Sequence, residues 1–231
     1  SSLHNRISRR ALLKGAGSLA TLLLGNLHIP GAAWAAEAEP RRGGTIKIAV
    51  LGLDTADPHR HTGSIAVQQV YVETLTSIHE DGTVKPFLAE SYTTAPDGKS
   101  YTFRIRDNVR FHNGRVMTAA DILANFERVK TSVKGGWLAS AMKFVTSVTA
   151  PTPRTVTVTL SQPYAPFLAV LSELWILAPE SEGWAGTITR PIGTGPFQFG
   201  TWTPKVRLVA PAHPQYWKPG RPYASVVQFD L

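Results

Sequence analysis

Apolar and polar residues alternate strictly in two short segments of the chain, at residues 101–106 and 155–160. In the first segment, Tyr101, Phe103 and Ile105 share one face, and in the second, threonines alternate with valine and leucine. A period of two residues predicts β-strands with one buried face. β-Branched and aromatic residues predict further strands at 45–50, 197–199 and 226–229.

Apolar residues spaced three and four positions apart predict two helices. The first is expected over residues 65–78, where this spacing joins Val67, Val70, Tyr71, Thr74, Leu75 and Ile78. The second opens at Thr118, which forms a capping box with Asp121 in place of the usual glutamate. It is expected to end near Lys130 and to bury Ile122, Leu123, Phe126 and Val129. Glycine-containing turns are expected at 80–82, 96–98 and 113–114.

The first 35 residues have the three parts of an export signal. Arg9 and Arg10 precede an apolar run at 16–27, and Ala33 and Ala35 form a small-residue site, so cleavage is expected after Ala35. The apolar run is shorter than the roughly 20 residues that span a bilayer, which favours a removed signal over an uncleaved membrane anchor. The paired arginines resemble a twin-arginine signal, which would make the twin-arginine export machinery a partner. Residues 36–42 would then be a linker.

The chain has 24 lysine and arginine residues against 16 aspartate and glutamate residues, for a formal net charge of +8. Beyond the predicted signal the basic residues are scattered along the sequence, and only Arg41 and Arg42 are adjacent. Because nucleic-acid binding requires clustered basic residues, no nucleic-acid partner is predicted. The chain has no cysteine, which excludes disulfides and a lipid-modified N-terminal cysteine. These features predict a periplasmic protein that is soluble after signal cleavage.

Short motifs occur in a fixed order along most of the chain after residue 42. They are GGTIKI at 43–48, DPH at 57–59, VETL at 72–75, PFLAES at 86–91, DGKSYTF at 97–103, RDNVRFHNG at 106–114, TAAD at 118–121, LSQP and APFL within 160–168, PIGTGPF at 191–197 and QYW at 215–217. Each motif is weak alone. As an ordered set they resemble the extracellular solute-binding proteins of the peptide/nickel class, family 5, which deliver ligand to ABC importers.

The resemblance implies an α/β fold, namely a periplasmic-binding-protein type II-like lobe with a mixed sheet and an inserted α+β domain, in truncated form. Residues 43–71 and 167–231 would make an incomplete first domain, and residues 72–166 the inserted second domain. The second ligand lobe would be absent. Since ligand in such proteins is enclosed between two lobes, the chain is expected to be a fragment with greatly reduced affinity.

The function implied by the resemblance is that of the periplasmic solute-binding component of an ABC importer. The solutes would be oligopeptides, nickel chelates or similar small polar molecules, and the second partner would be the membrane permease. Binding without a cofactor is expected, and the absence of G-x-S-x-G, H-E-x-x-H and cysteine motifs argues against an enzyme. The alternative is a non-transporting, chaperone-like fragment that binds partners through an exposed apolar face.

Candidate ligand contacts lie in the loop at 54–63, which follows the first strand. Because α/β sheets present ligands at the carboxyl ends of their strands, His59, His61 and Thr62 are predicted to line the cleft. No metal site is predicted, since two histidines without an evident third ligand bind a metal weakly.

Lys134 and Trp137 are further candidates, by resemblance to a segment of nickel-type members that reaches into the cleft. There, a basic residue and a tryptophan meet a carboxylate-bearing metal chelate, and Lys134 and Trp137 stand at these positions. Lysine would supply a point charge and tryptophan a stacking surface. The alternative is that Trp137 packs over the preceding helix.

Two other patterns receive structural interpretations. The glycine-rich segment at 193–196 lacks the lysine of a phosphate loop, so a tight backbone turn is expected there. The remaining tryptophans of the folded part are expected to pack against the core and surface, in preference to forming a carbohydrate platform; they are Trp175, Trp184, Trp202 and Trp217.

Overall fold

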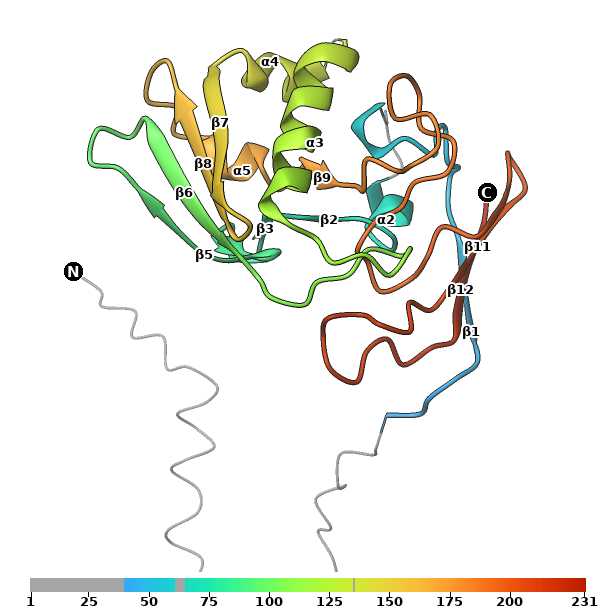
Figure 1. Cartoon of the computed structure of the whole chain (residues 1–231). Coiled ribbons are helices and arrows are strands. Elements are labelled where there is room, and N and C mark those ends of the chain that lie inside the picture. The colour runs from blue at the N-terminus through green and yellow to red at the C-terminus, as the bar shows by residue number, and fades with distance from the viewer. Residues whose placement is uncertain (1–39, 61–64, 135) are drawn as a thin grey trace, which may run out of the picture. The chain divides into compact units, whose positions relative to one another are not determined.

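The computed structural model describes residues 40–60, 65–134 and 136–231 (Figure 1). Residues 41–231 form one compact unit. Among the described residues, no helix is both long enough and apolar enough to cross a membrane. The predicted export signal, with Arg9, Arg10 and the cleavage site after Ala35, lies outside the described residues and stays a prediction.

Two four-stranded sheets organise the unit. Sheet 1 has the order β1 (Thr45–Ala49), β12 (Val226–Asp230), β11 (Arg207–Pro211) and β10 (Thr201–Thr203). Its β1 is parallel to β12, and the other pairs are antiparallel. Sheet 2 is antiparallel, with the order β5 (Ala89–Thr94), β6 (Ser100–Ile105), β8 (Thr155–Leu160) and β7 (Val145–Thr152). The fold is therefore mixed α/β with a mixed first sheet.

Shorter elements connect and cover the sheets. Two strand pairs lie between them: β2 (Glu73–Thr74) with β9 (Trp175–Ile176), and β3 (Thr76–Ile78) with β4 (Val84–Pro86). The helices are η1 (Pro58–Arg60, a 3-10 turn), α2 (Ile65–Gln68), α3 (Ala119–Ser132), α4 (Gly136–Met142) and α5 (Phe167–Val170). The longest of them, α3, packs against β7 and β8 of sheet 2 (Figure 1).

The period-two segments form strands as predicted. In β6, Tyr101, Phe103 and Ile105 are buried, and in β8 the valines and Leu160 are buried while the threonines are partly exposed. The predicted strands at 45–50 and 226–229 are also present, as β1 and β12.

The second predicted helix is present as α3. Its start is fixed by the backbone N–H of Thr118, which donates to the Asp121 carboxylate over 2.8 Å. Of the residues predicted to be buried on α3, Ile122, Phe126 and Val129 are fully buried, whereas Leu123 is only half-buried.

The helix predicted over residues 65–78 is wrong beyond Gln68. The chain continues as β2 and β3 instead. The three- and four-residue spacing arises because Tyr71 packs in the core on sheet 1, while Leu75 packs in the core on sheet 2. The β-branched residues of this segment also favour extended backbone. The three- and four-residue spacing therefore reflects burial in two different cores and does not mark one face of a helix.

The strand predicted at 197–199 is reduced to one isolated bridge between Phe197 and Ala212. Pro196 has no N–H to donate to a ladder, and a Cβ on Gly200 would lie 2.3 Å from the Val209 carbonyl oxygen. The segment therefore runs close beside β11 without extending the sheet.

Each sheet has its own hydrophobic core. The core on sheet 2 includes Phe103, Phe126 and Phe167, and the core on sheet 1 includes Tyr71 and Phe229. The four tryptophans predicted to pack do so: Trp175 is buried in the core on sheet 1, and the other three pack partly buried against one of the two cores. The predicted domain boundaries, 43–71 with 167–231 against 72–166, stay a prediction.

Buried Glu73 on β2 ties three segments together. Its side-chain oxygens accept hydrogen bonds from Tyr216 Oη (2.6 Å), Thr194 Oγ1 (2.9 Å) and Trp217 Nε1 (2.9 Å). Burial raises the pKa of Glu73, and the three hydrogen bonds oppose that rise. Glu73 thus holds the segments at 194 and 216–217 against β2.

The glycines at 193 and 195 allow two backbone segments to pack closely. The predicted role in a tight turn is therefore wrong. Neither has a positive φ. A Cβ on Gly193 would lie 1.9 Å from the Tyr71 carbonyl oxygen, and one on Gly195 would lie 2.6 Å from the Val70 carbonyl oxygen. Only glycine lets the two backbones approach this closely.

His112 lies against the same two glycines. Its Nδ1 accepts a hydrogen bond from the Gly193 N–H (3.3 Å), so Nε2 carries the proton and donates to the Gly195 carbonyl (3.0 Å). Burial lowers the pKa of His112 to about 4. The neutral imidazole is therefore part of the folded structure.

We expect Gly193→Ala to destabilise the fold by about 2–4 kcal/mol, because the added methyl collides with backbone that cannot yield. Chemical denaturation followed by tryptophan fluorescence measures this. The matched control is Gly186→Ala, where the nearest atom to the new Cβ is 4.0 Å away and the φ is not positive. Its effect should stay within about 1 kcal/mol. Equal losses for the two variants would contradict the close-packing argument.

We expect acid to destabilise the fold through His112. Between pH 6.5 and about 4, the unfolded chain takes up a proton at this residue and the folded chain does not. Its contribution to stability is therefore complete above pH 6.5 and declines by up to about 3 kcal/mol as the pH falls to 4. Unfolding free energies of wild type and His112→Gln across this range test the expectation. The exposed His79→Gln is the control and should follow wild type; a His112→Gln profile parallel to wild type would contradict the expectation.

Candidate functional site

A hollow of about 980 Å³ lies at the carboxyl ends of β1 and β12. The residues that line it are Val50, Leu51, Gly52, Leu53, Asp54, Ala66, Val67, Trp202, Pro204, Lys205 and Leu231. Most of this wall is apolar, and Asp54 and Lys205 supply one charge of each sign. Open α/β sheets present ligands at this end of their strands, so the hollow is the candidate solute site.

A buried ion pair fixes the loop that leads away from the hollow. Asp57 is 0% exposed and Arg128, on α3, is 3% exposed. Arg128 Nη2 lies 2.5 Å from Asp57 Oδ2, which also accepts the Ile188 N–H over 3.0 Å. Charges this deeply buried are stable only when they are paired and hydrogen-bonded, as both are here.

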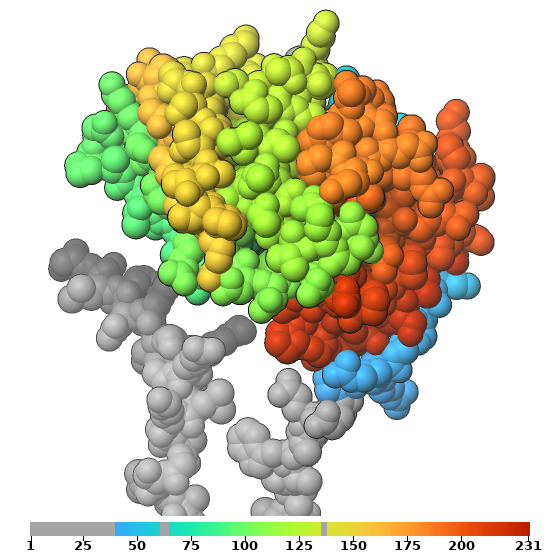
Figure 2. All heavy atoms as spheres, viewed as in Figure 1, coloured from blue at the N-terminus to red at the C-terminus, as the bar shows by residue number. Residues whose placement is uncertain are grey.

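The same guanidinium reaches a third segment. Arg128 donates to the carbonyl oxygens of Trp184 and Gly186, each over 2.9 Å. Neighbouring Asn125 donates to the Leu177 carbonyl (2.8 Å) and accepts the Leu177 N–H (3.1 Å). One face of α3 therefore holds the loop at 54–60 and the segment at 177–188. In the space-filling view, α3 and the orange segment beside it form a continuous surface (Figure 2).

His59 is one of the predicted ligand contacts, and the structure places it inside this cluster. It is 5% exposed. Its Nδ1 accepts from Arg128 Nη1 (2.7 Å), so Nε2 is protonated and donates to the Trp175 carbonyl (2.7 Å). A solute could bind either nitrogen only by displacing one of these partners. This geometry disfavours the predicted contact, which stays untested.

His61 and Thr62 lie outside the described residues, and the side chain of Trp137 is not described. Lys134 is exposed, just beyond the end of α3. The guanidinium of Arg60 donates to the carbonyl of Ser132, in the last turn of α3. This hydrogen bond brings the ends of the two predicted segments, 54–60 and 132–134, to the same end of α3. Ligand contacts by these residues stay predictions.

A second hollow, of about 470 Å³, lies beside β2 and β9. Its polar lining includes Gln69, Glu73, Glu173 and Tyr216. Trp175, which is 4% exposed, also lines it, and its indole Nε1 has no hydrogen-bond partner in the described structure. An unpaired buried donor is costly, so an acceptor atom that reached this indole would stabilise the structure there.

No group of three or more histidine, cysteine, aspartate or glutamate side chains is placed to hold a metal ion within the described ranges.

Sequence reasoning missed Arg128, Asp57 and Glu73. A signal was present on α3: Asp121, Asn125 and Arg128 are all buried and follow one another at spacings of four and three residues. This polar row runs beside the apolar face that the sequence did predict. Polar residues that follow the helical period next to an apolar face therefore indicate buried hydrogen-bonded side chains.

The fold is that of periplasmic binding proteins. NikA from Brucella suis, solved in complex with Fe(III)-EDTA, superposes with a TM-score of 0.73 at 28% identity, covering 81% of this chain and 39% of that one. The oligopeptide-binding protein AppA from Bacillus subtilis, solved with a nonapeptide, gives a TM-score of 0.76 at 25% identity, covering 84% and 41%.

Sequence comparison gives the family. Residues 83–231 match the family described as bacterial extracellular solute-binding proteins, family 5 Middle. The glutathione-binding protein GsiB of Escherichia coli O1:K1 / APEC is 30% identical over 174 residues, which cover 73% of this chain and 34% of that protein. The chain therefore belongs to the family 5 extracellular solute-binding proteins, and the predicted resemblance is confirmed. It spans about a third of the length of the curated relatives it matches.

We expect Arg128→Met to destabilise the protein by about 3–5 kcal/mol, because it leaves the Asp57 carboxylate buried without its partner. Arg104→Met is the matched control. It breaks the pair with Glu90, in which the side chains are 62% and 46% exposed, and should cost no more than about 1 kcal/mol. Denaturant titration of the two variants makes the comparison. Similar losses would contradict the anchoring role of Arg128.

Proposed function

We propose that this chain is the solute-binding component of an ABC importer for small polar solutes such as oligopeptides or nickel chelates. Membership in the family 5 solute-binding proteins is the observation that carries the proposal. The relatives named above include a glutathione-binding protein and proteins solved with a nonapeptide and with Fe(III)-EDTA. No catalytic step is proposed, since the family's function is binding.

The hollow at the carboxyl ends of β1 and β12 supports this proposal. A peptide presents both an ammonium and a carboxylate group, and Asp54 and Lys205 offer the complementary charges in an apolar surround. A metal chelate with a free carboxylate oxygen would be matched by Lys205 alone. His61, Thr62, Lys134 and Trp137 are proposed to add contacts from the neighbouring segments. The hollow is open on one side, so the described unit alone would bind its solute weakly.

The proposed compartment is the periplasm. The support is the sequence of residues 1–35, with Arg9, Arg10 and the small-residue site before Ala36. The twin-arginine machinery is the proposed export route. The importer's membrane permease is the proposed partner in transport.

One observation favours the alternative of a non-transporting, chaperone-like fragment. Ile46 and Ile48 on β1 are 50% and 39% exposed, although they lie level with buried Val227 and Phe229 on β12. The apolar face of sheet 1 thus continues onto an exposed edge strand. Such a surface could bind a partner in place of completing a solute-binding protein.

The test is a nuclear magnetic resonance titration of residues 36–231 with glutathione, a nonapeptide and nickel–histidine. We expect at least one solute to shift signals of residues 50–54 and 202–205 in fast exchange. Lys205→Gln should weaken that binding about tenfold by removing a charged contact with the solute carboxylate. The exposed Lys143→Gln is the control and should leave it unchanged.

Two results would contradict the proposal: shifts confined to residues away from the hollow, or no shifts at millimolar concentrations of all three solutes. Strong binding of a hydrophobic dye by monodisperse protein, reduced by Ile46→Thr together with Ile48→Thr, would support the alternative instead.

A further inference from the structure

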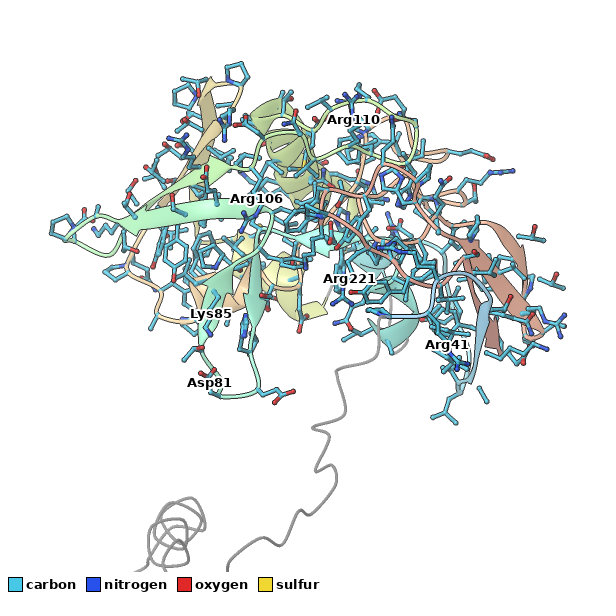
Figure 3. The ribbon with its side chains drawn as sticks, turned by 90° about the horizontal axis from the view of Figure 1, so that it is seen from below. Arg41, Asp81, Lys85, Arg106, Arg110 and Arg221 are labelled. Carbon is cyan, nitrogen blue, oxygen red and sulfur yellow. The ribbon has the colours of Figure 1, made fainter. Side chains whose placement is uncertain are left out.

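A basic face lies on the lower side of the molecule. Seen from below, Arg106 and Arg221 lie near its middle, with Lys85 to one side and Arg41 to the other (Figure 3). Lys218 joins them, because Lys218 and Arg106 both lie over the ring of Trp217. No pattern of neighbouring residues indicated this cluster, since its members come from separate segments of the chain.

Aromatic rings hold these cations in place. The Trp217 ring carries the Arg106 guanidinium at 5.1 Å and the Lys218 ammonium at 4.9 Å from its centroid. Lys218 also lies 4.3 Å from the centroid of Phe87. Cation–π contacts of this kind fix a positive charge without neutralising it.

Tyr223 organises a second pair in the same way. The guanidinium groups of Arg221 and Arg42 lie 4.3 and 5.5 Å from the centroid of its ring. Arg42 is further fixed by donating to the Gly220 carbonyl over 3.1 Å. The two guanidinium groups therefore belong to one local assembly, which continues the basic face toward Arg41.

None of the ion pairs among the described residues includes Arg41, Arg42, Lys85, Arg106, Lys218 or Arg221. The acid whose charge acts on Lys218 is Glu73, which is buried and already accepts three hydrogen bonds. Asp81 lies at the edge, in the turn beyond Lys85 (Figure 3). Burial lowers the pKa of Lys218, and the charges of Arg106 and Arg221 lower it further.

The folded unit begins on this face. Arg41 follows the predicted cleavage site by only a few residues, and the five residues 36–40 can span at most about 17 Å. An export signal held in the membrane would therefore tether the chain through the segment next to Arg41 and Arg42.

We propose that the basic face docks on the anionic phospholipid surface of the membrane; this rests on the proposed periplasmic location. Planar guanidinium groups match phosphate oxygens in a bidentate manner. Each Lys or Arg near an anionic bilayer contributes about 1 kcal/mol of attraction, so a group of six gives weak, reversible association. Such association would keep the solute-binding protein near its membrane permease.

The experiment is co-sedimentation of residues 36–231 with vesicles of phosphatidylcholine containing 30% phosphatidylglycerol, and with pure phosphatidylcholine vesicles. We expect binding to the anionic vesicles only, lost when the salt concentration is raised to about 0.5 M. The variant Arg41→Gln, Lys85→Gln, Arg221→Gln changes three exposed cations. It should weaken vesicle binding at least about tenfold.

The matched control removes three cations from other elements: Lys99→Gln, Lys130→Gln and Lys143→Gln together. It has the same net charge as the first variant and should bind nearly as wild type does. Circular dichroism of each variant checks the fold. If the triple variant at residues 41, 85 and 221 unfolds, Arg106→Lys is the milder variant. Arg106→Lys should weaken vesicle binding because lysine cannot pair with phosphate in a bidentate manner.

Three outcomes would overturn the proposal. They are equal binding to both vesicle types, equal losses in the variant and the control, and retention on immobilised polyglutamate without vesicle binding, which would indicate an acidic protein partner. The vesicle assay contains no solute, and the solute titration contains no lipid. Failure of one proposal can therefore be told from failure of the other.

Discussion

The buried pair of Asp57 and Arg128 is the interaction on which the arrangement of this unit depends. It crosses from the loop after β1 to the middle of α3, and the same guanidinium holds the carbonyls of Trp184 and Gly186. A pair with both members excluded from water gains little net stability over an apolar contact, yet loss of one member is costly. The pair therefore acts mainly to fix one specific arrangement of the loop, the helix and the segment at 184–188.

Close backbone approach is the second constraint, and Glu73 makes it possible. The segment at 193–195 lies so near residues 70–71 that no side chain fits between them. Thr194, between the two glycines, donates to Glu73, and His112 binds both glycines from the other side. Backbone segments packed this closely cannot shift to admit water. Their polar groups must therefore form hydrogen bonds with one another.

Local patterns predicted local structure well. Alternation predicted β6 and β8, and the capping box at Thr118 predicted α3. The failures have one physical origin, namely that the partner of a residue is decided by the tertiary fold. Tyr71 and Leu75 are four residues apart but pack in different cores. Gly193 is required because the backbone of Tyr71 leaves no room for a side chain there. His59 was predicted at the ligand, yet its two nitrogens are engaged by Arg128 and Trp175. The basic face is assembled from distant segments, which no inspection of neighbouring residues could reveal.

The Asp57–Arg128 pair also affects how this unit would bind a solute. The loop that leaves the hollow at Asp54 is fixed three residues later by Asp57, and again at Arg60 through the end of α3. A wall fixed in this way is preorganised, so little ordering entropy opposes binding. Weak affinity in the described unit would then follow from the small area of contact, since the described residues supply one wall of the hollow. It follows that an added binding surface opposite Asp54 and Lys205 would raise affinity without first having to order this side of the site.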